Sequence, residues 1–84
     1  MKNQDRSIRV IAENNYRHDG FNIYLEFSGK REYLMSHRHN AFIFDMLKHG
    51  PRLAELRKKT KMHQEKIRHL LKVIDEYILD REAA

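Results

Sequence analysis

The sequence predicts an α+β fold: an N-terminal three-stranded antiparallel sheet followed by a three-helix, helix-turn-helix-like unit. Two observations predict it. Apolar and polar residues alternate over 21–27, which is typical of a strand with one apolar face, and after residue 39 apolar residues recur every three or four positions, which is typical of amphipathic helices. Because the sheet face and the helix stripes each need cover, a single core between sheet and helices follows. We expect one domain over 1–84, with a β-meander at 7–36 and the trihelical segment at 40–80.

The first two strands are indicated by residue type and by the turn between them. Residues 7–13 are β-branched and apolar enough for a strand, and 14–20 collects turn residues that end in Asp19-Gly20, a pair that favours a tight turn. The apolar face of the second strand is expected to consist of Phe21, Ile23, Leu25 and Phe27.

The register of the second hairpin is predicted from parity. Residues 31–36 form the partner strand, and Ser28-Gly29 breaks the run before it. An odd loop over 28–30 places Tyr33 and Met35 on the apolar face, whereas an even loop would place polar residues there, Lys30 and Glu32 among them, with Leu34. We therefore expect the odd loop, with Glu26 and Glu32 as surface charges on the solvated face.

The first two helices are predicted from spacing and end signals. Asn40 is a candidate N-cap for a helix that carries Phe42, Ile43, Met46 and Leu47 at helical spacing. Gly50 is placed to end that helix in a left-handed conformation, and Pro51 to open the next helix at its first position. This short second helix has Leu53 and Leu56 three residues apart.

The last helix is expected from about residue 63 to residue 80, after a brief interruption at 60–62. Its apolar stripe is formed by Ile67, Leu70, Leu71, Ile74 and Ile78, and it is widened by Val73 and Tyr77.

The composition excludes several classes of protein. An 84-residue chain is large enough for one modest core and too small for most enzymes with an interdomain active site. The lack of cysteine rules out disulfides, Cys-ligated zinc and a thiol nucleophile. Neither an apolar signal region nor a run approaching the roughly 18 residues of a spanning helix is present, so we expect a cytoplasmic protein with no membrane association.

The positive charge of the chain is concentrated in one segment. The formal net charge is +5, yet residues 48–72 carry nine Lys and Arg against two Asp and Glu, a net charge of +7. The last 12 residues have a net charge of −3. A polyanionic partner is therefore expected at 52–72, although a run of charges can also be a solvated face.

The stretch LAELRKKTKMHQEKIRHLLKVID, preceded by Gly50-Pro51 at the end of the first helix, resembles the helix-turn-helix core of small bacterial winged-helix regulators. The resemblance covers 40–78. Lys61 stands where the family has a turn glycine, no wing follows the last helix, and the predicted hairpin precedes the helices. The resemblance implies DNA binding by the last helix, which would enter the major groove.

The expected DNA contacts are the polar residues of the second helix, the turn and the outer side of the last helix. Arg68 and Lys72 lie four residues apart and can reach guanine edges or phosphates, and Gln64 suits adenine or a phosphate. The complete set is Arg52, Lys58, Lys59, Lys61, Gln64, Arg68, His69 and Lys72. We expect a transcriptional or mobile-element accessory regulator that binds double-stranded DNA as a homodimer on a two-fold site.

Three alternatives stay open at this point. The helices can be a plain helical hairpin that covers the sheet, and the whole chain can be a protein-interaction or dimerisation module, with Ile78 and Leu79 making an end-to-end helix contact. A third possibility is that the sheet itself lies in a DNA groove, with contacts from Arg9, Arg17, Tyr24 and Arg31.

Metal binding and catalysis find little support in the sequence. His37 and His39 would share a strand face, but no cysteine or carboxylate cluster lies near them to complete a site. No phosphate-binding glycine loop, nucleophile elbow or grouped Ser/His/Asp arrangement occurs. We therefore expect no enzymatic activity, no metal and no cofactor.

Overall fold

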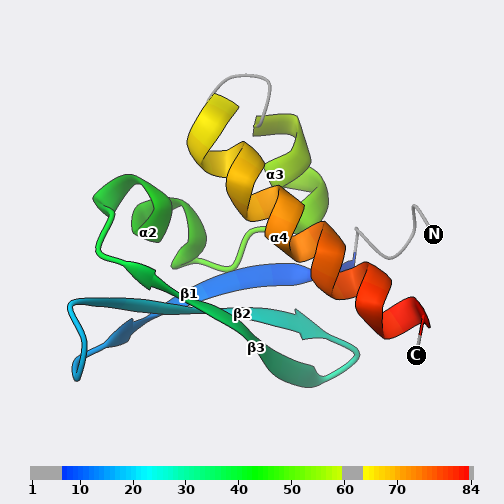
Figure 1. The fold of residues 1–84 in the computed structure, drawn as a ribbon, viewed down its shortest axis with the longest axis horizontal. Helices are drawn as coiled ribbons and strands as arrows, with labels where there is room; N and C mark the ends of the chain where they lie inside the picture. Colours follow the sequence, from blue (N-terminus) through cyan, green and yellow to red (C-terminus); the bar gives the residue numbers. More distant parts are fainter. Residues whose placement is uncertain (1–6, 60–63, 84) are drawn as a thin grey trace.

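The computed structural model describes residues 7–59 and 64–83 and has the predicted α+β architecture. A three-stranded antiparallel sheet of order β1-β2-β3 is followed by three helices, all of which lie on one face of the sheet (Figure 1). The elements are β1 (Arg9–Asn15), β2 (Gly20–Phe27), β3 (Lys30–Arg38), α2 (Ala41–Leu47), α3 (Leu53–Lys59) and α4 (Gln64–Ala83). In the described part of the chain, no helix is long and apolar enough to cross a membrane.

The core lies between the sheet and the helices. Val10 is paired with Leu25, and Ala12 with Ile23, so the alternation of both strands places small and large apolar side chains on the helix-covered face. The buried residues of this core are Ile8, Val10, Ala12, Phe21, Ile23, Leu25, Ile43, Leu47, Leu53, Leu56, Ile67, Leu70, Leu71 and Ile74. These include the residues predicted for α3 and most of those predicted for β2 and α4. Phe27 and Ile78 pack against the core and are only partly buried.

The predicted odd loop between β2 and β3 is wrong. Phe27 is paired directly with Lys30, so the turn consists of Ser28 and Gly29 alone, both with positive φ (51° and 72°). Such a two-residue turn matches the right-handed twist of a hairpin, because both central residues take left-handed conformations. As a result Tyr33 is opposite Tyr24 on the solvated face, where it is 52% exposed, and not on the apolar face.

A β-bulge restores the apolar face further along β3. The pairing shifts between Ile23 and Tyr24, so that Met35 is opposite Ile23 and the intervening Leu34 has no partner. Leu34 and Met35 are both partly buried and pack against the core. The expectation for Met35 is therefore met through an irregularity that parity alone does not reveal.

The connection from α2 to α3 runs along the edge of β1. Asn40 caps α2, since its side-chain oxygen accepts a hydrogen bond from the Ile43 amide at 3.1 Å, and Gly50 has the expected positive φ of 67°. The prediction that Pro51 opens the next helix is wrong, because α3 begins at Leu53. The chain around Arg52 instead bridges to Arg9 in antiparallel fashion, with Val10 N donating to the Pro51 carbonyl and Leu53 N to the Ile8 carbonyl.

Glu32 is another correction to the sequence interpretation. The two-residue turn places it on the helix-covered side, opposite Leu25, where its side chain is 19% exposed. There its carboxylate accepts a hydrogen bond from the Tyr77 hydroxyl and forms an ion pair with Arg81. The distal half of α4 is thus tied to β3.

Candidate nucleic-acid interface

The outer face of α4 is basic in its N-terminal half. Arg68, His69 and Lys72 are exposed, while the alternate positions Ile67, Leu70 and Leu71 are buried. This division follows from the period of 3.6 residues, which places positions three and four apart on one face. Neither Arg68 nor Lys72 forms an ion pair with any residue that the structure describes.

Two exposed cations, Lys58 and Lys59, end α3. The preceding Arg57 is different, because it is half-exposed and its guanidinium forms an ion pair of 2.8 Å with Asp75 of α4. Arg57 and Asp75 also line a shallow hollow of about 410 Å³ together with Arg68, Leu71, Lys72, Glu76 and Leu79. The C-terminal end of α3 and the middle of α4 therefore form one surface of mixed charge, on which Asp75 offsets part of the positive charge.

The predicted DNA-contacting residues do not all belong to this surface. Lys61 and the side chain of Gln64 lie outside the described residues. Arg52 precedes α3 and lies opposite Arg9 on the solvated side of the sheet, since facing residues of an antiparallel pair project to the same side. The surface formed by Lys58, Lys59, Arg68, His69 and Lys72 is called the α3–α4 basic surface below.

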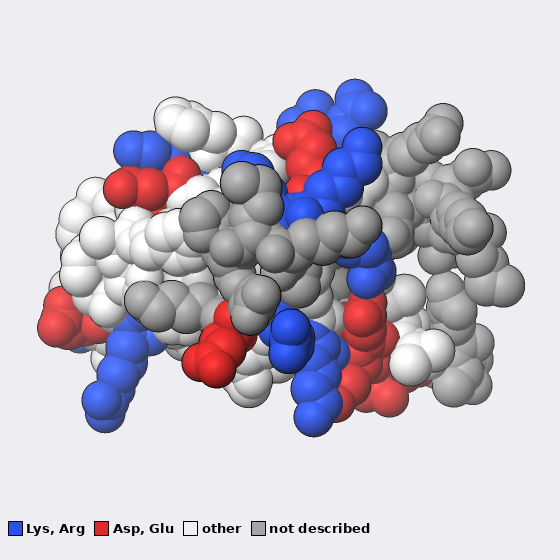
Figure 2. Space-filling view, turned by 90° about the horizontal axis from the view of Figure 1, so that it is seen from above, with Lys and Arg blue, Asp and Glu red and all other residues white. Residues whose placement is uncertain are grey.

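The charges of α4 change sign along the helix. The N-terminal half exposes the cations Arg68 and Lys72 together with one carboxylate, Glu65. In the C-terminal half, Asp75, Glu76 and Asp80 follow. On the helical side of the molecule, blue and red atoms lie close together and do not separate into two large fields (Figure 2). The cations of α4 are therefore concentrated in its N-terminal half, and most of its exposed carboxylates lie in the C-terminal half.

The solvated face of the sheet has its own hydrogen-bonded cluster. The Arg31 guanidinium lies 5.6 Å from the centroid of Tyr24 and bonds to the carboxylates of Glu13 and Glu26, which raise the pKa of Arg31. The rings of Tyr33 and Tyr24 meet in a T-shaped arrangement with their centroids 6.0 Å apart. The Tyr24 ring is thus already in contact with both Arg31 and Tyr33.

One histidine, His37, has a structural role on β3. The His37 ring stacks on Phe21, with centroids 5.2 Å apart, and its Nδ1 lies 2.7 Å from the Arg38 carbonyl oxygen. Over 7–59 and 64–83, no group of three or more His, Asp or Glu side chains is arranged to hold a metal ion.

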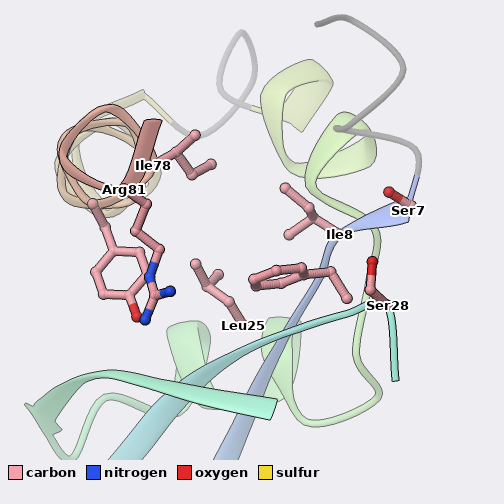
Figure 3. A pocket seen from close by; sticks show the side chains of 8 residues that line it. Ser7, Ile8, Leu25, Ser28, Ile78 and Arg81 are labelled. Atoms are coloured by element: carbon pink, nitrogen blue, oxygen red, sulfur yellow. The ribbon is translucent and has the colours of Figure 1, made fainter. Parts of the chain in front are cut away.

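An apolar hollow of about 400 Å³ opens between the C-terminal part of α4 and the sheet (Figure 3). Ile8, Leu25 and Ile78 converge on it, and Arg81 lies at its α4 side, with Ser7 and Ser28 at the opposite side. Phe27 and Tyr77 complete the lining. Arg81 is already paired with Glu32, so its charge is partly neutralised there.

The structure also reveals residues that the sequence interpretation left out. Asp75 lies beside the α3–α4 basic surface, where it pairs with Arg57. The feature of the sequence that could have indicated it is the acidic run that begins after Lys72. Arg9 is among the residues predicted to contact DNA if the sheet lies in a groove. Its position opposite Arg52 depends on a pairing between segments more than 40 residues apart. No protein-family model, curated protein or solved structure matches the chain.

Proposed function

We propose that this protein binds double-stranded DNA through the α3–α4 basic surface, with the N-terminal half of α4 in the major groove. The observation that carries the proposal is the exposure of Arg68 and Lys72, one helical turn apart, on the side of α4 opposite its buried stripe. Both lack an ion-pair partner among the described residues, so their charges are available to a ligand.

The dimensions and chemistry of a DNA groove fit this arrangement. The major groove is wide enough for one α-helix, and an Arg guanidinium can bond bidentately to a guanine edge. Lys72 and the exposed lysines that end α3, Lys58 and Lys59, suit phosphates that flank the groove. The acidic C-terminal half of α4 would be repelled by the phosphates, so the helix would insert by its N-terminal half, as recognition helices do.

The test is duplex binding by fluorescence anisotropy as a function of salt. The wild type is expected to lose affinity steeply between about 50 and 200 mM salt, because bound cations release counterions from the duplex. Arg68→Ala/Lys72→Ala should bind more weakly, and its salt slope should be lower by about 2 if both residues contact phosphates. The proposal is abandoned if the wild type shows no salt-sensitive binding.

A matched control removes two charges at the other end of the sheet. Arg17 lies in the β1–β2 turn and Arg38 ends β3, and both are exposed. Arg17→Ala/Arg38→Ala changes the net charge by the same amount as the α4 variant. If the two variants lose affinity equally, binding reflects net charge alone and the α3–α4 basic surface is not the site.

We further propose that the protein acts as a homodimeric regulator of transcription or of a mobile element. Leu79 supports a second contact on α4, because it is 63% exposed in the half of the helix that the DNA contact leaves clear. Leu79→Glu is expected to shift the sedimentation of a dimer to that of a monomer. The alternative of a protein-interaction module without DNA binding would instead show salt-insensitive association through this residue.

A further inference from the structure

Two arginines face each other across the edge of the sheet. Arg9 and Arg52 form an isolated antiparallel bridge, flanked by the hydrogen bonds from Val10 N to the Pro51 carbonyl and from Leu53 N to the Ile8 carbonyl. This is the geometry of a non-hydrogen-bonded pair, in which the Cα atoms are about 4.5 Å apart and the side chains are closest. Both side chains are exposed, on the face of the sheet that the helices leave open.

Neither arginine is neutralised by the described part of the protein. The Arg9 Nη1 donates to the Gly50 carbonyl at 2.8 Å, and Arg52 has no side-chain partner among the described residues. The nearest carboxylate along the row is that of Glu26, which is opposite Arg9 and is bonded to Arg31. Like charges directly opposite each other across two strands destabilise a sheet.

A hollow with further cations adjoins Arg9. It has a volume of about 390 Å³ at the end of the sheet, beside the turn that joins β2 and β3. Lys30 and Arg31 contribute charge to its lining, and Glu26 is its carboxylate. The remaining lining residues are Ser7, Phe27, Ser28 and Gly29. The described residues pair Arg31 with carboxylates but give Lys30 none, so positive charge is in excess around Arg9.

We propose that Arg9 and Arg52 together bind a phosphate group. The Arg52 guanidinium presents two parallel N–H donors that match the oxygens of phosphate, and Arg9, whose Nη1 donates to Gly50, keeps its other N–H groups for the same anion. A bound dianion would replace the repulsion between the two arginines by charge-assisted contacts. Lys30 adds a positive charge to the hollow that it lines together with Arg9. The site is on the face of the sheet opposite to α4 and is independent of the proposed DNA contact at Arg68 and Lys72.

The experiment is a titration of the full-length, ¹⁵N-labelled protein with inorganic pyrophosphate, followed through the arginine Nε–Hε signals by NMR. The expected result is a saturable shift of the Arg9 and Arg52 signals, which persists when sodium chloride holds the ionic strength constant. Arg52→Gln should abolish saturation at Arg9. Arg38→Gln, which removes the same charge from the far end of β3, should leave the titration unchanged.

Melting temperatures distinguish a loss of phosphate binding from a loss of folding in these variants. Without phosphate, Arg52→Gln should melt at or slightly above the wild-type temperature, because it relieves a like-charge pair and keeps every backbone hydrogen bond. Pyrophosphate should raise the Tm of the wild type and of Arg38→Gln but not that of Arg52→Gln. A folded wild type without a saturable shift at Arg9 and Arg52 overturns the proposal.

A second titration identifies the source of the phosphate. Duplex DNA that shifts the Arg9 and Arg52 signals, including in Arg68→Ala/Lys72→Ala, assigns the site to a nucleic-acid backbone. A response to pyrophosphate alone assigns it to a small phosphate-bearing molecule. Either response supports the phosphate site, and because the α4 variant is tested separately, failure of the DNA proposal leaves this result intact.

Discussion

The hydroxyl of Tyr77 donates a hydrogen bond of 2.7 Å to the Glu32 carboxylate, which joins α4 to β3 across 45 residues of chain. The same carboxylate forms an ion pair with Arg81 at 2.7 Å, and the Arg81 guanidinium lies 5.2 Å from the centroid of the Tyr77 ring. These three side chains hold the C-terminal half of α4 against the sheet. They also bring a carboxylate to the side of the sheet that the helices cover.

Tyr77→Phe should remove the hydrogen bond while leaving the packing of the ring. Because Glu32 is mostly buried and keeps its ion pair with Arg81, we expect the free energy of unfolding to fall by about 1–2 kcal/mol in a denaturant titration. Tyr16→Phe is the control, since Tyr16 is 93% exposed. Equal stability of Tyr77→Phe and the wild type would show that the hydrogen bond adds nothing.

Asn40→Ala should destabilise α2 by loss of its N-cap. The Asn40 side chain accepts from the Ile43 amide, and α2 has only seven residues, so its first turn is a large part of the helix. We expect a loss of about 1 kcal/mol in the free energy of unfolding. Asn40→Ser, which retains a capping oxygen, should restore most of the stability, and a loss as large as that of alanine would contradict the role of the cap.

Two glycine substitutions should differ in cost for a geometric reason. A Cβ at Gly20 would lie 2.2 Å from the His37 carbonyl oxygen, which is backbone and cannot move without disturbing the pairing of β2 and β3. Gly20→Ala is therefore expected to cost about 3 kcal/mol or more.

At Gly29 nothing lies within 4 Å of a built Cβ, and only the positive φ of 72° opposes alanine. Gly29→Ala should cost about 1 kcal/mol, the penalty of a left-handed conformation. Both losses of unfolding free energy can be measured from the midpoints of denaturant titrations, provided that the slope of the free energy against denaturant is unchanged. The reverse order of stability would mean that β2 and β3 are not paired at Gly20 as described.

Asp75→Asn should strengthen duplex binding if the α3–α4 basic surface is the DNA site. The substitution removes the carboxylate that pairs with Arg57 and lines the same hollow as Lys72. We expect a two- to fivefold gain in affinity, about the effect of one partly screened charge, which disappears at high salt. Because the ion pair is half-exposed, the loss of stability should stay below about 1 kcal/mol.

Asp45→Asn is the matched control for this gain. Asp45 forms an ion pair with Lys48 at 3.4 Å on α2, so its substitution changes the net charge equally at a different place. An equal gain from both variants would assign the effect to net charge and not to the α3–α4 basic surface.

Periodicity predicted most of the fold because it reports directly on burial. Phe21, Ile23 and Leu25 of the alternation in β2 are buried, as are Leu53 and Leu56 of α3. Asn40 and Gly50 were predictable for a similar reason, since a capping side chain and a left-handed glycine act within a few residues of chain.

The errors arose where distant segments decide the local structure. Parity favoured the odd loop because Tyr33 and Met35 alternate, but the bulge at Leu34 lets a two-residue turn and a buried Met35 coexist. The prediction that Glu32 lies on the solvated face failed because its partners, Tyr77 and Arg81, belong to α4 and are far away in sequence. In the candidate site, exposure of Arg68 and Lys72 followed from helix periodicity, whereas the separation of Arg52 from them required knowledge of its pairing with Arg9.

The strip of chain beside β1 also bears on the solubility of the protein. An open strand edge is a template on which another chain can add by backbone pairing, and this is a common start of aggregation. Near Val10 that template is occupied, because the Val10 amide donates to the Pro51 carbonyl and the Leu53 amide donates to the carbonyl of Ile8, just before β1. On the opposite edge, the bulge at Leu34 and the cations of β3 interrupt and repel an incoming strand. Backbone pairing by a second chain is therefore blocked at the start of β1 and opposed along β3.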